Sequence, residues 1–198
     1  MDFKPSRDEQ VRRPPLPVKI VIAGGFGVGK TTAVAQISDT PVLTTEAPIT
    51  EVAAEIDRTG QVPDKTTTTV ALDFGTVAID DEVKLYLFGT PGQDRFGFMW
   101  QDLTEGALGA LVIVDTRRLD DCYPAVDYFE RAGLPFLVAL NLFDGRLTHS
   151  LEDVRWALAL NEDTPMVTFD ARDRISVRDT LVALLSRSFA VASSATPQ

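Results

Sequence analysis

The chain has 198 residues, of which 44% are hydrophobic, and this length and apolar content suit a single domain with a substantial core. Its 19 basic and 29 acidic residues give a formal net charge of −10, which argues against a nucleic-acid backbone as the partner. Cys122 is the only cysteine, which excludes an internal disulfide and a cysteine-based metal cluster and fits a reducing cytoplasm.

The two ends of the chain are predicted to be tails. Residues 1–17 hold four prolines and mixed charge and are expected to be disordered, and residues 191–198 are expected to be flexible. No apolar run approaches the roughly 18 residues needed to cross a bilayer, and neither end carries a signal peptide or lipidation motif. We therefore expect a cytoplasmic protein without a membrane anchor of its own, which a partner would have to recruit to any membrane.

Between the tails, strand and helix patterns alternate. Strands are predicted at 18–23, 70–79, 83–88, 107–115, 135–141 and 166–169. Helices are predicted at 31–38, 98–105, 122–132, 151–160 and 176–189. The second and third strands form a hairpin that turns at Asp80 and Asp81, whereas the other strands are apolar runs typical of parallel strands covered on both faces. The pattern predicts an α/β fold with a doubly wound, mostly parallel, six-stranded sheet and one antiparallel strand.

The strongest motif is the stretch GGFGVGKTT at residues 24–32, directly after the first strand. It fits the phosphate-binding pattern GxxxxGK[ST], in which glycine-rich backbone turns its N–H groups toward an anion at the start of a helix. Lys30 is expected to reach the β- and γ-phosphates, and the Thr31 hydroxyl is expected to bind Mg²⁺. The predicted nucleotide contacts in this loop are Gly25, Phe26, Gly27, Val28, Gly29, Lys30, Thr31 and Thr32.

Two further segments lie where strands meet the expected phosphate site. GTPGQDRF at residues 89–96 follows the third strand, so Gly92 can offer its N–H to a γ-phosphate and Gln93 can orient the attacking water. Four threonines at residues 66–69 precede the second strand, and one of their hydroxyls can complete the coordination of Mg²⁺. A β-prone edge leading into a strand is the alternative interpretation of the threonines.

TVALDF and TPGQDRF together resemble the two switch regions of Ras-superfamily small GTPases, and the proline before Gly92 is most similar to the prokaryotic MglA-type and actinobacterial conservon-type branch. The resemblance covers residues 18–190 and implies a small GTPase G domain, with an extended switch I at 39–69 and switch II at 89–98. By position it assigns Thr69 to the switch threonine that binds the metal, with Thr66 as the alternative. It implies GTP or GDP and Mg²⁺ as ligands and a roadblock-domain protein as partner.

The base-reading elements match less completely. Asn141 and Asp144 fit the family pattern NKxD, in which the carboxylate accepts from two guanine N–H donors that adenine lacks, but Leu142 replaces the lysine. Ala171, after the last strand, matches the SAK element, in which a backbone N–H contacts the guanine oxygen. A turn after a strand is the alternative explanation of Asn141 and Asp144 when they are taken alone.

Two residues depart from the family pattern. Gly89 occupies the place of the DxxG aspartate that holds the metal through water, which leaves open how Mg²⁺ is held. Phe26 would crowd an arginine finger arriving in trans, so we hypothesise a positive charge supplied in cis by Lys65 or Arg58, either of which can equally be a surface charge. Both lie in the long segment before the threonines, where Ile49, Val52, Ala53 and Ile56 predict an apolar face on a short helix.

These features predict a nucleotide-controlled switch with slow, Mg²⁺-dependent GTP hydrolysis, in which Gln93 and Lys30 are the catalytic residues. Two alternatives remain from the residues alone. Gly89 and Phe26 favour a GTP-binding scaffold that does not hydrolyse, and the phosphate loop by itself also suits an ATP-using enzyme such as a small-molecule kinase.

Overall fold

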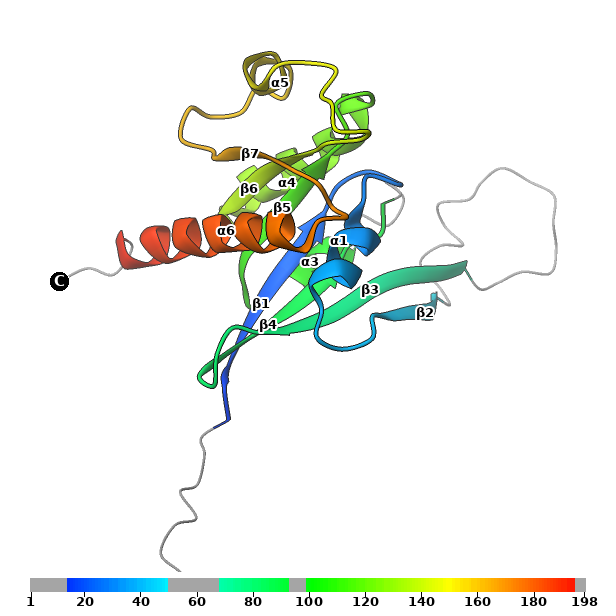
Figure 1. Ribbon diagram of the computed structural model, residues 1–198, viewed down its shortest axis with the longest axis vertical. Coiled ribbons are helices and arrows are strands. Elements are labelled where there is room, and N and C mark those ends of the chain that lie inside the picture. The colour runs from blue at the N-terminus through cyan, green and yellow to red at the C-terminus, as the bar shows by residue number, and fades with distance from the viewer. Residues whose placement is uncertain (1–13, 50–67, 93–98, 195–198) are drawn as a thin grey trace, which may run out of the picture.

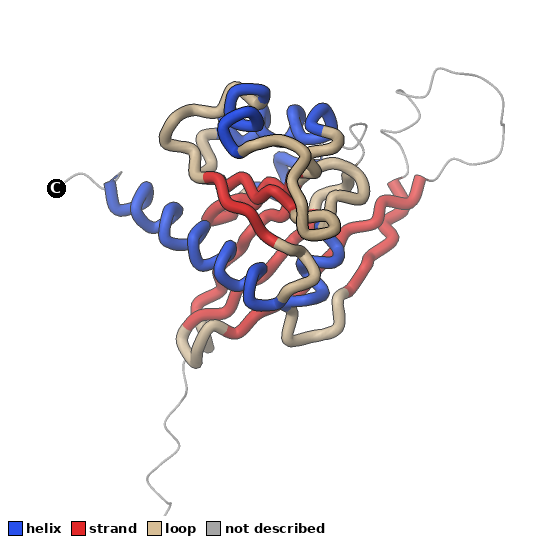
Figure 2. The backbone as a smooth tube through the Cα atoms, turned by 45° about the horizontal axis from the view of Figure 1, so that its top comes forward, coloured by secondary structure: helices blue, strands red, loops and turns tan. Residues whose placement is uncertain are grey.

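The computed structural model describes residues 14–49, 68–92 and 99–194. They form a seven-stranded sheet in the order β2-β3-β4-β1-β5-β6-β7, with helices on both of its sides (Figures 1 and 2). The strands are β1 (Leu16–Ala23), β2 (Leu43–Ile49), β3 (Thr68–Ala78), β4 (Val83–Gly89), β5 (Ala107–Val114), β6 (Phe136–Asn141) and β7 (Met166–Phe169). The helices are α1 (Lys30–Ile37), α3 (Trp100–Thr104), α4 (Tyr123–Ala132), α5 (Leu151–Ala157) and α6 (Arg174–Ser194), with a 3₁₀ turn η2 (Leu119–Cys122) before α4.

The strand directions confirm the predicted doubly wound α/β fold. β4, β1, β5, β6 and β7 are joined by parallel pairs, while β3 is antiparallel to both of its neighbours. β3 is therefore the one strand that runs against the others, as the hairpin predicted. All six predicted strands are present, and β2 is a seventh strand at the edge of the sheet.

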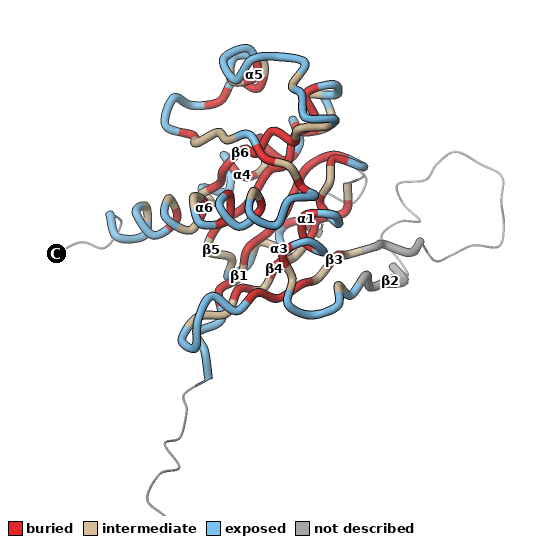
Figure 3. The backbone as a smooth tube through the Cα atoms, in the orientation of Figure 1, coloured by how far each residue is buried: buried red, intermediate tan, exposed pale blue. Residues whose placement is uncertain are grey.

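Two apolar cores lie on opposite faces of the sheet. On one face, α1 and α6 pack against β1, β4 and β5, with Val34 and Leu184 among the buried residues that they contribute. On the other face, α4 covers β5 and β6 through Val126 and Phe129, and Trp100 of α3 belongs to the same cluster. The central strands are buried on both sides, which Figure 3 shows as buried backbone running through the middle of the molecule. This explains why β5 and β6 read as unbroken apolar runs.

The element boundaries differ from the prediction at both tails. β1 begins at Leu16, inside the predicted tail, because Leu16 and Pro17 pair with β4. Pro17 is tolerated since the pairing of β1 with β5 begins only at Lys19. α6 continues to Ser194, into the segment predicted to be a flexible tail, because no glycine or proline interrupts its sequence.

The long segment before β3 also differs. Residues 43–49 form β2, antiparallel to β3, where the sequence predicted a loop and then a short helix. Ile49 ends this strand and so does not begin a helix, whereas Val52, Ala53 and Ile56 lie outside the described residues. Within the described part of the chain, no helix has the length and apolarity required to cross a membrane.

Candidate functional site

The loop Gly24–Gly29 joins β1 to α1 and wraps tightly against neighbouring backbone. Gly24 and Gly29 have φ of 134° and 109°, a region that L-residues with a side chain rarely adopt. A Cβ on Gly29 would lie 2.7 Å from the Asn141 amide nitrogen, and one on Gly24 would overlap the carbonyl oxygen of Ile113. The two glycines are therefore required both for the turn and for its close contact with β5 and β6.

Lys30 begins α1 and folds back over this loop. Its ammonium is buried and donates hydrogen bonds to the carbonyl oxygens of Gly24 (2.9 Å) and Gly25 (2.6 Å). Burial lowers the pKa of Lys30 to about 8, and the negative charge of Asp73 opposes part of that decrease. An anion bound in the loop would favour the charged form of Lys30 and raise this pKa again.

Asp73 is a site residue that the sequence analysis missed. It lies on β3, is buried, and accepts a short hydrogen bond from the Thr31 hydroxyl. A Cβ on Gly89 would lie 3.0 Å from the Asp73 Cβ, so the Asp73 side chain fills the space beside the position where the family pattern has its DxxG aspartate. Asp73 thus brings a carboxylate from the neighbouring strand to the space beside Gly89. An aspartate in the middle of a strand is unusual, and that was the available signal.

The residues around Thr31 fit a magnesium ion. Mg²⁺ is commonly held by one or two protein oxygens together with substrate phosphates and water, and Thr31 and Asp73 provide a hydroxyl and a carboxylate at the start of α1. Among the described residues, no group of three or more histidine, cysteine, aspartate or glutamate residues is placed to hold a metal. The donor set therefore suits a metal shared with a bound phosphate.

The predicted switch residues are only partly described. A Cβ on Gly92 would lie 2.7 Å from the Lys30 ammonium and 2.9 Å from the Phe26 Cα, so the start of switch II does reach the phosphate loop. The backbone of Thr69 lies in β3 opposite Pro48. Gln93, Thr66, Lys65 and Arg58 lie outside the described residues.

Asn141, at the end of β6, fastens the phosphate loop to the loop after β7. Its amide nitrogen donates to the carbonyl of Val28 at 2.9 Å, and its amide oxygen accepts from the backbone N–H of Ala171 at 3.1 Å. All three residues are buried. The structure therefore brings together residues 28, 141 and 171, three of the residues that the sequence predicted to contact nucleotide.

Asp144 lies in the tight turn after Asn141, with a left-handed φ of 55° that aspartate tolerates better than most residues. The negative charge of Asp144 acts on two arginines, Arg117 and Arg172. Hydrogen bonds to Asp115 and Asp170 are the main causes that raise the pKa of Arg117 and Arg172, and the charge of Asp144 adds to both increases. The carboxylate of Asp144 thus lies among cationic groups from two other loops.

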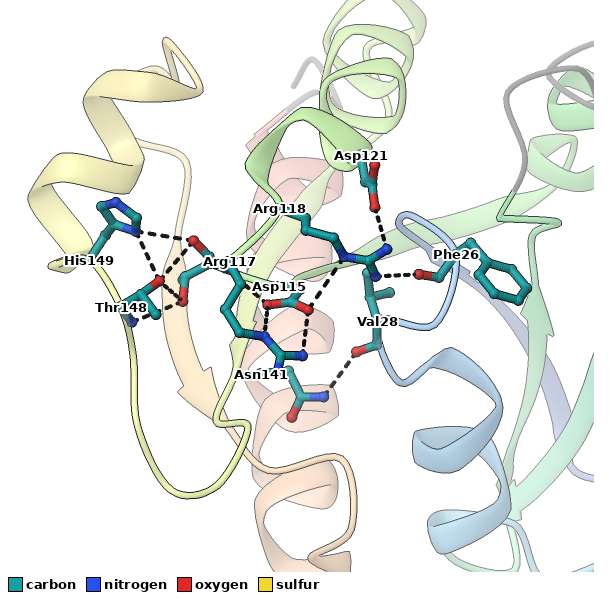
Figure 4. Close-up of polar contacts among 10 residues, drawn as sticks. Phe26, Val28, Asp115, Arg117, Arg118, Asp121, Asn141, Thr148 and His149 are labelled. Carbon is teal, nitrogen blue, oxygen red and sulfur yellow. Dashed lines mark hydrogen bonds and ion pairs between the residues drawn. The ribbon is translucent and has the colours of Figure 1, made fainter.

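The loop after β5 contributes a second unpredicted cluster. Asp115 is 1% exposed and receives two parallel hydrogen bonds from the Arg117 guanidinium, at 2.9 and 2.7 Å, which hold the pKa of Asp115 below its usual value. The same guanidinium lies 4.0 Å from the centre of the Phe143 ring, in the turn that carries Asp144. Figure 4 shows Arg117 bonded to Asp115 in the loop after β5, and the contact of Arg117 with Phe143 joins this loop to the turn after β6. The polar stretch DTRR directly after an apolar strand was its sequence signal.

Residues 22–193 match the model of a family described as a conserved hypothetical ATP-binding protein. This chain belongs to that family. An uncharacterized protein of Methanocaldococcus jannaschii is 32% identical over 129 residues, which are 64% of this chain and 71% of the relative.

Two solved structures of similar fold are a small GTPase and a G domain. The Arl6 (BBS3) small GTPase from Trypanosoma brucei, with the nucleotide analogue GppNp bound, has a TM-score of 0.61 and 17% identity, over 88% of this chain and 99% of that one. The G domain of FeoB from Methanococcus jannaschii has a TM-score of 0.57 and 15% identity, over 87% and 98% of the two chains.

These likenesses confirm the predicted fold, that of a nucleotide-binding P-loop NTPase of the G-domain type. The narrower assignment to the MglA-type and conservon-type branch stays a prediction.

Proposed function

We propose that this ATP-binding-family member is a guanine-nucleotide switch that binds GTP or GDP with Mg²⁺ and hydrolyses GTP slowly. The observation that carries the proposal is the fastening of the phosphate loop to the base-side loops by Asn141, with Asp144 held in the following turn. This arrangement places the turn that carries the Asp144 carboxylate directly after the residue that is bonded to the phosphate loop. A carboxylate pairs with the two donors on the Watson–Crick edge of guanine, and adenine offers no such pair.

Within this proposal, each residue has a definite task. Lys30 would neutralise phosphate charge. The Thr31 hydroxyl would bind the metal directly, and Asp73 on β3 would orient that hydroxyl. Gly92 would donate its N–H to the γ-phosphate. Gln93 would orient water, and Thr69, or Thr66 if the register shifts, would complete the metal coordination. The Ala171 N–H, which donates to the Asn141 amide oxygen in the structure, would exchange that partner for the guanine oxygen when nucleotide binds.

The partner and the regulation are proposed from the MglA-type resemblance. A roadblock-domain regulator would read the switch I segment at 39–69, and a partner would bring the protein to any membrane on which it acts. Phe26 is 67% exposed on the phosphate loop, so its ring would crowd an arginine finger that a partner inserts in trans. This supports a catalytic positive charge supplied in cis. Lys65 and Arg58 are candidates for that charge.

ATP use is a second candidate because the family is described as ATP-binding. Two experiments distinguish ATP use from GTP use. The copurifying nucleotide is extracted from the purified protein and its base is identified, and ATP is then made to compete against GTP for binding. Asp144→Asn should weaken GTP binding and improve binding of xanthosine triphosphate, whose ring carries an oxygen in place of the amine. If ATP competes as well as GTP and this variant changes neither, the guanine assignment is wrong.

Measurement of phosphate release distinguishes the proposed GTPase from a GTP-binding scaffold that does not hydrolyse. Wild type should release phosphate slowly, at about 10⁻⁴–10⁻³ s⁻¹ without a partner, and Gln93→Leu should be slower still. Equal rates in both proteins would remove Gln93 from the mechanism, and no release with or without a partner would favour the scaffold. Single-turnover hydrolysis by Lys65→Ala and Arg58→Ala tests the charge in cis.

A further inference from the structure

The loop after β5 packs against the outer side of the phosphate loop. A Cβ on Gly25 would overlap the Cβ of Asp121, and one on Gly27 would lie 3.8 Å from a terminal nitrogen of Arg118. Figure 4 shows Arg118 reaching from this loop to the backbone at Phe26. The phosphate loop therefore has the loop after β5 as a close neighbour along residues 25–27.

The Arg118 guanidinium is held by three acceptors. Its Nη2 donates to the carbonyl oxygen of Phe26 at 2.7 Å, and its other nitrogens lie 3.8 Å from Asp115 and 3.3 Å from Asp121. Asp115 is itself fixed by Arg117. The ion pair of Arg118 with Asp121 is solvent-exposed on both sides and contributes little to stability. The hydrogen bond to Phe26 is the contact through which Arg118 reaches the phosphate loop.

The hydrogen bond acts on one particular peptide unit. The carbonyl of Phe26 and the N–H of Gly27 belong to the same peptide, and all described peptide bonds are trans, so the two groups point in opposite directions. With the carbonyl directed outward to Arg118, the Gly27 N–H is directed away from Arg118. Gly27 has φ of 72°, and its lack of a side chain permits this orientation.

Charge on the donor strengthens the effect. A cation bonded to a carbonyl oxygen draws electron density from the peptide and makes the N–H of that peptide a stronger donor. A row of such N–H groups is what binds phosphate in a loop of this kind.

We propose that Arg118 is a positioning residue that orients and polarises the Phe26–Gly27 peptide so that the Gly27 N–H binds nucleotide phosphate. The inference rests on the proposed nucleotide binding and deepens it by adding a residue from outside the phosphate motif. Arg118 does not touch the nucleotide, so its effect passes entirely through the peptide.

The test compares Arg118→Met, Arg118→Lys and the control Arg131→Gln, which breaks an exposed ion pair with Asp127 on α4. Binding of fluorescent GDP with Mg²⁺ is measured together with the amide ¹H shift of Gly27 in the nucleotide-bound protein. We expect Arg118→Met to bind roughly five- to twenty-fold more weakly and to move the Gly27 amide signal upfield, as one charge-assisted hydrogen bond is lost. Arg118→Lys, which keeps a charged donor, should recover part of both changes, and the control should match wild type.

A purely structural Arg118 would give a different pattern. Thermal unfolding of all variants shows whether the fold is intact, and unchanged binding with an unchanged Gly27 signal in folded Arg118→Met overturns the inference. Lys30→Ala separates the two proposals. If wild type binds nucleotide and Lys30→Ala does not, the proposed binding stands whatever Arg118 does. If wild type binds no nucleotide, both proposals fail.

Discussion

Replacing Lys30 by methionine should stabilise the nucleotide-free protein while destroying its affinity for nucleotide. The folded chain holds this ammonium in a buried position that lowers its pKa from 10.5 to about 8. That difference amounts to about 3 kcal/mol against the folded state at neutral pH. Methionine removes this cost but also the donors to Gly24 and Gly25, each worth about 1 kcal/mol. The expected net gain is about 1 kcal/mol, or a rise in Tm of about 2–4 °C for a chain of this size.

The pH dependence gives an independent check. Because the unfolded chain binds the proton of Lys30 more tightly than the folded chain, the contribution of this residue to the free energy of unfolding rises between about pH 8 and 10.5. Thermal unfolding of nucleotide-free wild type should show this rise, and Lys30→Met should lack it. Lys84→Met, which removes a lysine from β4, serves as control. If Lys30→Met is less stable than wild type and has the same pH profile, the description of Lys30 as a buried ammonium with a lowered pKa is wrong.

Three further substitutions test the rest of the site. Asp73→Asn keeps the shape of the side chain but removes its charge, and it should weaken Mg²⁺ binding in the nucleotide complex roughly ten- to a hundred-fold by metal titration; unchanged affinity would remove Asp73 from the metal site. Asn141→Ala leaves the Val28 carbonyl and Ala171 N–H without this partner, so urea unfolding should show a loss of about 2–4 kcal/mol, and a loss below about 0.5 kcal/mol would contradict the fastening. Gly29→Ala places a Cβ against Asn141 at a φ of 109°, and nucleotide binding measured by fluorescence titration should be lost; retained binding would show that the loop can relax.

Much of the fold was readable because its signals are local. The apolar runs of β5 and β6 are buried on both faces, and the glycines at 24 and 29 sit at backbone angles that only they adopt easily. The same holds for the positions of Asn141 and Asp144, since Asn141 ends the apolar strand β6 and Asp144 lies in the turn that follows it. Local pattern was enough wherever one element alone determined the position of the residue.

What escaped prediction depends on contacts between segments far apart in the chain. Asp73 and Thr31 are 42 residues apart, and nothing in either segment reveals that their side chains meet. Arg118 lies 92 residues from Phe26 in the sequence. The strand β2 was missed because LTTEAPI lacks a clear alternation and contains a proline, and it is its pairing with β3 that makes it a strand.

The proximity of Asp73 to Gly89 restricts the substitutions that evolution can accept at these two positions. An aspartate introduced at 89 would place a second negative charge against the first, and a glycine introduced at 73 would leave the site with none. Either substitution alone therefore impairs this part of the protein. Only the two substitutions together keep one carboxylate between the two positions. Related chains should therefore carry an acidic residue at one of the two positions and a small residue at the other.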